Sequence, residues 1–243
     1  LKIAKDIIFA ANQNNNLFFF EKKSGEILKQ IPTEETVVKN QFVNNLSIAA
    51  NNIFFLNTYG SLYSVDINSK RVAWFLNLNQ SLDLDTNNLF LSSQVLNFKN
   101  KVVVSSNHNL YVIDNRSGNI ILKKDFSPII SPIIIDNFLF LITKKNYLIS
   151  IDLNDGRTLY SYDLDKQIAN FLKIKEKNAK FKSLMMANNK LLIFLNNSFI
   201  LTLNVEGRIE KVEKLPSKIE TFPIIIDKSI LYLDKSNKLS VIN

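Results

Sequence analysis

Short stretches of alternating hydrophobic and polar residues run along the whole chain, and one of them recurs six times. Each copy has an apolar residue, three residues rich in alternating or β-branched types, and then an acidic or amide residue. The copies end at Glu21, Asp66, Asp114, Asp152, Asn204 and Asn243. Alternation over so short a stretch predicts a β-strand. The mean spacing of about 44 residues is typical of a four-stranded propeller blade.

A repeated turn follows these strands. Gly25, Gly118, Gly156 and Gly207 stand three or four residues after the acidic or amide residue, where a tight turn needs a positive φ. In the second copy Lys70 stands where glycine is expected. We expect the acidic and amide residues to accept hydrogen bonds from backbone N–H groups of the turn.

Two further hydrophobic runs precede each copy. The first is clearest at 132–136 and 223–227, which share the same five letters, and such apolar triplets predict strands covered on both faces. All five prolines lie between units or open a first strand, where no ladder hydrogen bond is lost. A sandwich or single barrel has no reason to repeat a turn at a near-constant interval. The pattern therefore predicts an all-β chain, a single β-propeller domain of four-stranded antiparallel blades, with units at about 1–30, 46–78, 94–126, 131–164, 183–214 and 222–243.

Two places depart from the repeat. Extra residues fall at about 167–182, where a short basic helix or a solvated loop carrying lysines is expected. The last unit ends in its third strand, and residues 1–6 align with 131–136, inside a first strand. We expect either the C-terminal part of a longer, eight-bladed ring with a secretion signal, or a six-bladed variant with an incomplete closing blade.

The repeat resembles the pyrroloquinoline-quinone-type propeller repeat, most clearly at residues 57–66 with Trp74 eight residues on. The places that match Trp74 hold Lys29, Leu122, Tyr160 and Lys211. One branch of this family is the quinoprotein dehydrogenases, which hold a quinone between a tryptophan and an adjacent-cysteine disulfide, with calcium. The other is the BamB-type lipoprotein of the outer-membrane β-barrel assembly machinery, a docking scaffold. That resemblance implies a monomeric scaffold within a larger complex in the periplasm, tethered to the inner leaflet of the outer membrane.

Composition narrows the chemistry. The absence of cysteine excludes thiolate metal sites, disulfides and a cysteine nucleophile, and it weakens the resemblance to the dehydrogenases. No apolar run approaches the length that spans a membrane, so no transmembrane segment is expected. The net charge of +8 comes mostly from lysines spread along the whole chain, whereas nucleic-acid binding favours clustered arginine, so no nucleic-acid partner is expected.

Few residues qualify as chemical sites. The single histidine, His108, occupies a turn position. The pairs Asp83 and Asp85, and Asp163 and Asp165, would point to one side of an extended chain and could hold calcium, but each pair lacks further oxygen ligands. Residues 152–156 faintly resemble a calcium loop and are interpreted as a repeat turn. We therefore expect no catalytic, cofactor-binding or metal-binding residue, and no cofactor.

The expected function is non-enzymatic protein binding, with an outer-membrane β-barrel assembly factor as partner by resemblance. The loops that join the last strand of one unit to the first strand of the next lie together on one face of a propeller, here at about 31–45, 77–94 and 167–182. The candidate partner-binding residues in them are Asn40, Phe42, Asp83, Asp85, Phe90, Lys173 and Lys175. The alternatives are a quinone-dependent dehydrogenase-like enzyme and an unrelated sensory or adhesive propeller.

Overall fold

The computed structural model describes residues 1–34, 45–79, 94–106, 108–227 and 229–242. Within these residues the chain forms 23 strands in six antiparallel sheets and one helix. The chain divides into two compact units, residues 1–127 and residues 128–243.

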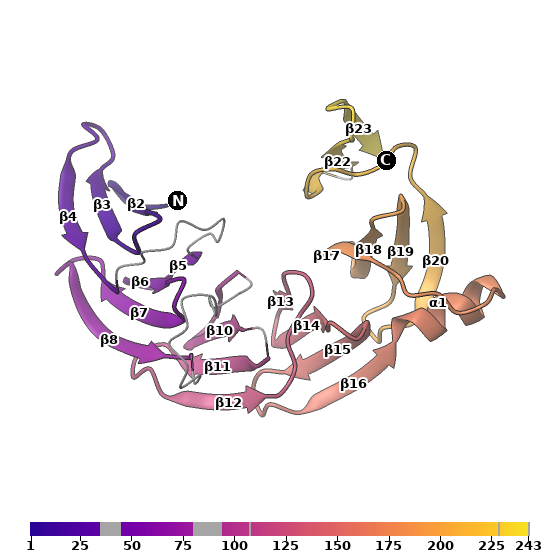
Figure 1. The fold of residues 1–243 in the computed structure, drawn as a ribbon, viewed down its shortest axis with the longest axis horizontal. Coiled ribbons are helices and arrows are strands. Elements are labelled where there is room, and N and C mark those ends of the chain that lie inside the picture. The colour runs from indigo at the N-terminus through magenta and orange to yellow at the C-terminus, as the bar shows by residue number, and fades with distance from the viewer. Residues whose placement is uncertain (35–44, 80–93, 107, 228, 243) are drawn as a thin grey trace. The chain divides into compact units, whose positions relative to one another are not determined.

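The first unit contains three four-stranded sheets (Figure 1). The first sheet is β1 (Lys2–Ala4), β2 (Ile7–Ala11), β3 (Leu17–Glu21) and β4 (Ile27–Ile31). The second is β5 (Asn45–Ala49), β6 (Asn52–Leu56), β7 (Ser61–Asp66) and β8 (Arg71–Asn77). The third is β9 (Leu96–Phe98), β10 (Lys101–Ser105), β11 (Leu110–Asp114) and β12 (Ile120–Lys124).

The second unit contains two four-stranded sheets, one three-stranded sheet and the helix. The fourth sheet is β13 (Ile133–Ile135), β14 (Phe138–Ile142), β15 (Tyr147–Asp152) and β16 (Thr158–Asp163). After helix α1 (Leu164–Leu172) comes the fifth, β17 (Phe181–Ala187), β18 (Lys190–Leu195), β19 (Phe199–Leu203) and β20 (Ile209–Lys214). The last is β21 (Ile224–Ile226), β22 (Ser229–Leu233) and β23 (Leu239–Ile242).

Every sheet is a simple meander, because each strand pairs antiparallel with the strand that follows it in sequence (Figure 1). The prediction of an all-β chain of six repeated antiparallel sheets is confirmed, including the missing fourth strand in the last sheet. A meander places the turns between first and second strands and between third and fourth strands at one end of the sheet. The other turns and the connections to the next sheet lie at the opposite end, called here the connection end.

The repeated turn has the expected geometry. Its glycines have φ between 76° and 80°, and Lys70 adopts φ 54° in the second copy. In all five four-stranded sheets the pairing of third and fourth strands shifts register just before this turn, as a β-bulge does. The predicted side-chain caps are confirmed: Asp114 Oδ1 accepts from the backbone N–H of Ser117 at 2.8 Å, and Asp66 Oδ1 from that of Ser69 at 2.6 Å.

Buried apolar faces hold neighbouring sheets together inside each unit. In the first unit Phe9 and Phe19 pack against Ile53 and Phe55 of the next sheet, and the rings of Phe9 and Phe19 meet edge to face at 4.9 Å. In the second unit a larger cluster joins the fourth and fifth sheets. Burying one apolar side chain of this size stabilises the folded state by about 1.5–3 kcal/mol.

Two expectations need correction. The triplet at 224–226 is not covered on both faces, because Ile224 and Ile226 are more than half exposed. The extra segment contains a helix, but it starts at Leu164 rather than near residue 167, because Asp163 caps its first turn by accepting from the Lys166 backbone N–H at 3.1 Å.

Candidate functional site

An aromatic residue of the fourth strand joins the second and third sheets. The indole of Trp74 in β8 donates from Nε1 to the carbonyl of Asn115 at 3.1 Å and lies against Gly118. A Cβ at Gly118 would lie 2.8 Å from Cδ2 of Trp74, so only glycine leaves room for the ring. The Phe54 ring contacts the indole as well, with ring centres 5.9 Å apart.

Tyr160 in β16 takes the same position between the fourth and fifth sheets. Its hydroxyl donates to the Val205 carbonyl at 3.0 Å, and its ring lies against Gly207 as Trp74 lies against Gly118. Burial raises the pKa of the Tyr160 hydroxyl. The ring also stacks on Tyr162, with centres 5.1 Å apart.

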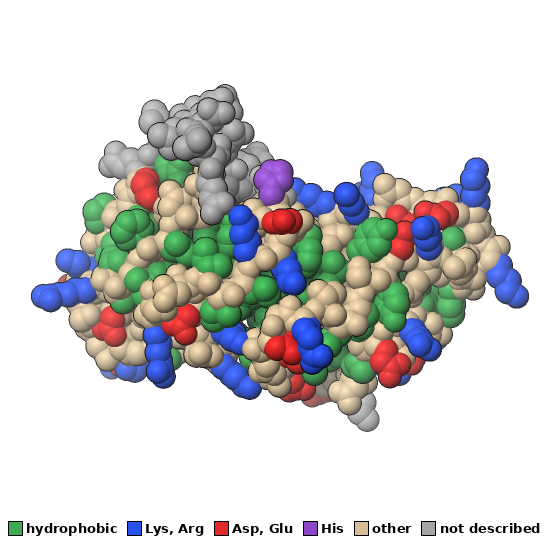
Figure 2. Space-filling view, turned by 90° about the horizontal axis from the view of Figure 1, so that it is seen from below, with side chains coloured by type: hydrophobic (Ala, Val, Ile, Leu, Met, Phe, Trp, Pro, Cys, Tyr) green, Lys and Arg blue, Asp and Glu red, His purple; other side chains and the backbone are tan. Residues whose placement is uncertain are grey.

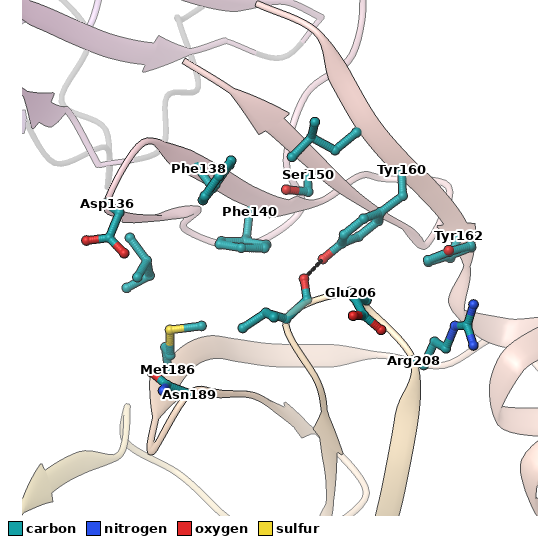
Figure 3. A pocket seen from close by; sticks show the side chains of 13 residues that line it. Asp136, Phe138, Phe140, Ser150, Tyr160, Tyr162, Met186, Asn189, Glu206 and Arg208 are labelled. Atoms are coloured by element: carbon teal, nitrogen blue, oxygen red, sulfur yellow. Dashed lines mark hydrogen bonds between the residues drawn. The ribbon is translucent and has the colours of Figure 1, made fainter. Parts of the chain in front are cut away.

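A cavity of about 590 Å³ lies beside Tyr160, within the second unit (Figure 3). Its walls are mainly aromatic and apolar, and its polar groups are few. This size and lining are typical of small-ligand sites. The side chains that form it come from the fourth and fifth sheets: Ile135, Asp136, Phe138, Phe140, Ser150, Leu159, Tyr160, Tyr162, Met186, Asn189, Val205, Glu206 and Arg208.

One polar atom in this cavity has no hydrogen-bond partner. Ser150 is 1 % exposed, and its hydroxyl has no hydrogen-bond partner of good geometry among the described residues. It does lie near enough to the Tyr160 hydroxyl to oppose part of the rise in the pKa of that group. At the equivalent position of the second sheet, the Ser64 hydroxyl accepts from Nδ2 of Asn52 at 2.7 Å. The place of Asn52 is taken by Phe138, since both pair with the acidic residue that ends the third strand. Ser150 has therefore lost its partner.

At the connection end of the first unit, Glu34 ties the segment after β4 to the β6–β7 turn. Its carboxylate accepts from the Ser61 hydroxyl at 2.6 Å, from Nδ2 of Asn57 at 2.6 Å and from the Tyr63 hydroxyl at 3.0 Å. Burial raises the pKa of the Glu34 carboxyl, but these hydrogen bonds outweigh it, and the pKa lies below its ordinary value.

At the connection end of the second unit, Asn146 holds the segment around helix α1. Its Nδ2 donates to Asp165 Oδ2 at 2.9 Å, to Asn178 Oδ1 at 2.8 Å and to the Ala179 carbonyl at 2.9 Å. Asp165 also accepts from the backbone N–H of Ala179 at 2.8 Å. These hydrogen bonds hold the segment in place and leave the end of α1 exposed.

The C-terminal end of α1 is apolar and basic at the surface. Phe171, Leu172 and Ile174 are each more than 40 % exposed. Lys173 and Lys175, two of the predicted partner-binding residues, are exposed among them, and Lys173 ends the helix with φ 54°. Asn40, Phe42, Asp83, Asp85 and Phe90 lie outside the described residues.

The other candidate chemical residues have structural roles. Asp163 and Asp165 do not share one side of an extended chain, because Asp163 ends β16 and caps α1, whereas Asp165 lies within the helix and accepts from Asn146. Asp152 accepts from the Asn154 backbone N–H at 2.8 Å, as the turn interpretation predicts. Among the described residues, no three His, Asp or Glu side chains gather as a metal site requires. His108 is exposed. Lysine and arginine side chains are spread over the face seen in Figure 2 and do not gather in one patch there.

A second exposed apolar surface lies on the last sheet. Ile224, Leu231 and Val241 are cross-strand neighbours on one face, and Leu233 and Leu239 form the next pair on it. Ile224, Leu239 and Val241 are more than half exposed. The opposite face packs on the fifth sheet through Tyr232.

Sequence reasoning missed the cavity. The necessary signal was present in the repeat itself, because Tyr160 aligns with Trp74 and Phe138 with Asn52. A smaller ring in one place and a lost hydrogen-bond donor in the other both indicate that this junction differs from its counterpart.

No protein-family model and no protein of curated function matches the sequence. Among solved structures, the chain is similar to BamB from Moraxella catarrhalis, with a TM-score of 0.74 and 11 % identity over 98 % of this chain and 70 % of that one. It is also similar to a europium-containing methanol dehydrogenase, with a TM-score of 0.67 and 12 % identity over 89 % of this chain and half of that one. Both are propellers of the pyrroloquinoline-quinone repeat type, so the sheets described above are propeller blades.

None of the described helices is long and apolar enough to cross a membrane.

Proposed function

We propose that the protein is a non-enzymatic scaffold that binds another protein through the connection end of its blades. The observation that carries this proposal is the surface at the end of α1, where Phe171, Leu172 and Ile174 are exposed between lysines. Exposed apolar groups rimmed by charge mark protein interaction sites. The Asn146 hydrogen bonds hold this surface in a fixed shape, which lowers the entropic cost of binding.

The similarity to BamB supports a scaffold of the same kind, located in the periplasm and tethered to the outer membrane, with a β-barrel assembly factor as partner. The exposed lysines and apolar side chains at the end of α1 would be complemented by a partner surface that is both acidic and apolar.

The alternative of a quinone-dependent dehydrogenase is supported by one similar structure, but the residues of this chain do not suit the quinone cofactor. A quinone of the type held in those enzymes needs a free tryptophan face and adjacent cysteines. Trp74 is packed against Gly118 and Phe54, and the chain has no cysteine. The residues present therefore do not fit that cofactor, and we derive no reaction through it.

A matched pair of variants tests the scaffold. Ile174→Ser and Ile121→Ser remove the same side chain from positions that are both 51 % exposed, one beside α1 and one on β12. We expect Ile174→Ser to weaken binding of the purified barrel-assembly factor by about tenfold, the loss seen at the minority of interface residues that carry most of the binding energy, whereas Ile121→Ser leaves it unchanged. Equal affinities of both variants and the unaltered protein, measured by calorimetry, would remove this surface from consideration.

A further inference from the structure

We propose that the cavity beside Tyr160 is a second binding site, which takes a tryptophan or tyrosine side chain of a partner protein next to a basic residue. The proposal rests on the scaffold function and adds a separate contact to it. Part of the cavity wall comes from Asp136, Asn189 and Glu206, in turns at the end of the sheets opposite to α1. The two sites can therefore be tested independently.

The counterpart of this cavity in the first unit shows which chemistry fits. There the indole of Trp74 fills the space between Phe54 and the turn at Asn115. The second unit has Tyr160 in place of Trp74, Phe138 in place of Asn52 and Met186 in place of Asn97. In the second unit the smaller ring of Tyr160 takes the place of the indole, and an aromatic-walled space lies beside it.

The walls suit a flat ring with one polar atom. Phe138, Phe140 and Tyr160 offer aromatic surfaces, and the thioether of Met186 packs well against ring edges (Figure 3). The Ser150 hydroxyl is buried without a partner, so an indole N–H or a phenol O–H satisfies it. An aliphatic side chain would fill the space but leave Ser150 unpaired.

The volume and the charged edge of the cavity favour an aromatic residue of a partner protein as the occupant, rather than a small aromatic compound. The cavity volume of about 590 Å³ lies in the range of drug-sized ligands and exceeds what a single ring fills. Asp136 and Glu206 place two carboxylates at its edge, against one guanidinium from Arg208 (Figure 3). A basic residue beside the aromatic one complements this edge.

The two methionines provide a direct readout. Met186 lines the cavity, whereas Met185, on the other face of the same strand, packs in the cluster with Leu192 and Phe194. The chain has only these two methionines, so a methyl-labelled sample gives two signals. We expect the peptide acetyl-Gly-Lys-Trp-Lys-Gly-amide to shift the Met186 signal saturably through the ring current, and to leave Met185 in place. The same peptide with alanine for tryptophan should shift neither signal.

Two substitutions test the geometry. Ser150→Ala removes the polar partner, and we expect it to raise the Kd of the tryptophan peptide about fivefold to tenfold. Ser183→Ala is the matched control, because Ser183 is also a buried serine of this unit without a hydrogen-bond partner among the described residues, and it does not line the cavity. Phe138→Asn restores the pair seen between Asn52 and Ser64 and should weaken binding further.

The outcomes separate the ideas. An unmoved Met186 signal at saturating peptide, or equal effects of Ser150→Ala and Ser183→Ala, overturns the proposal. Binding of free indole without binding of the peptide overturns the assignment to a partner side chain. If Ile174→Ser still weakens binding of the assembly factor in those cases, the scaffold function stands without this site. If Ile174→Ser has no effect but the peptide binds as described, the cavity stands and the α1 surface does not.

Discussion

The aromatic residue of the fourth strand and the glycine beneath it decide how the second blade joins the third and how the fourth joins the fifth. Trp74 and Tyr160 each reach the carbonyl that follows the end of the next blade's third strand, and each covers a glycine of the following turn. The glycine is required there for two separate reasons, its positive φ and the absence of a Cβ.

A glycine pair in the first unit separates these two reasons. Gly25 and Gly118 share φ 76°, but an added Cβ at Gly25 meets nothing within 4 Å, whereas at Gly118 it meets the base of the Trp74 ring. We expect Gly25→Ala to lower the free energy of unfolding by about 1–2 kcal/mol, from the backbone alone. We expect Gly118→Ala to lower the free energy of unfolding by about 1–3 kcal/mol more than Gly25→Ala does, because the indole has to move.

Urea unfolding followed by circular dichroism measures both variants, and the fluorescence of the single tryptophan reports on Gly118→Ala directly. Equal losses in the two variants would show that the ring does not need the space.

At the scale of elements, asparagine and glutamate side chains fix the connections between blades. Asn146 binds the segment after α1, and Glu34 binds the β6–β7 turn from the segment after β4. Asn146 and its counterpart Asn15 both have φ 60° in a turn between second and third strands. Asparagine tolerates this conformation while its side chain reaches a neighbouring segment.

The Glu34 contacts predict a pH dependence. Because the pKa of folded Glu34 lies below its ordinary value of 4.5, the ionised form stabilises the fold above that pH, and this contribution is lost as the pH falls through the folded pKa. We expect Glu34→Gln to lower the free energy of unfolding by about 0.5–1 kcal/mol at neutral pH, a small effect because Glu34 is partly open to solvent.

The difference between Glu34→Gln and the unaltered protein should shrink toward zero as urea titrations move from about pH 7 to about pH 3. Glu26→Gln, at an exposed carboxylate in the β3–β4 turn, is the control and should show no such trend. A constant difference across this range would contradict the role of the charge.

At the scale of the whole molecule, apolar surface is distributed unevenly over the described residues. The exposed face of the last sheet carries Ile224, Leu239 and Val241, and among the described strands β23 pairs with β22 alone. An apolar sheet face next to an open strand edge favours association.

We expect Val241→Lys to reduce self-association in light scattering by about twofold or more, because it places a charge in the middle of this face. Ser236→Lys adds the same charge to the β22–β23 turn of the same sheet and should change little. Equal scattering from both variants would assign the effect to net charge.

Much of the fold could be predicted from the sequence because each blade is made by local pairing. Consecutive strands and a turn that needs glycine and a capping carboxylate leave a repeated pattern, as at Asp114 and Gly118. The start of α1 was harder to place, since Asp163 both ends β16 and caps the helix.

The sequence by itself determined the repeated strands, the turns and the absence of cysteine chemistry, because these depend on residues close together in the chain. Only the tertiary structure decided that a cavity lies beside Tyr160, and that the Ser150 hydroxyl is buried in its wall. Those facts depend on how side chains from the fourth and fifth sheets pack around one space, and two of them, Ile135 and Arg208, are 73 positions apart in the sequence. A local sequence pattern does not reveal how well such distant side chains fill the space between them.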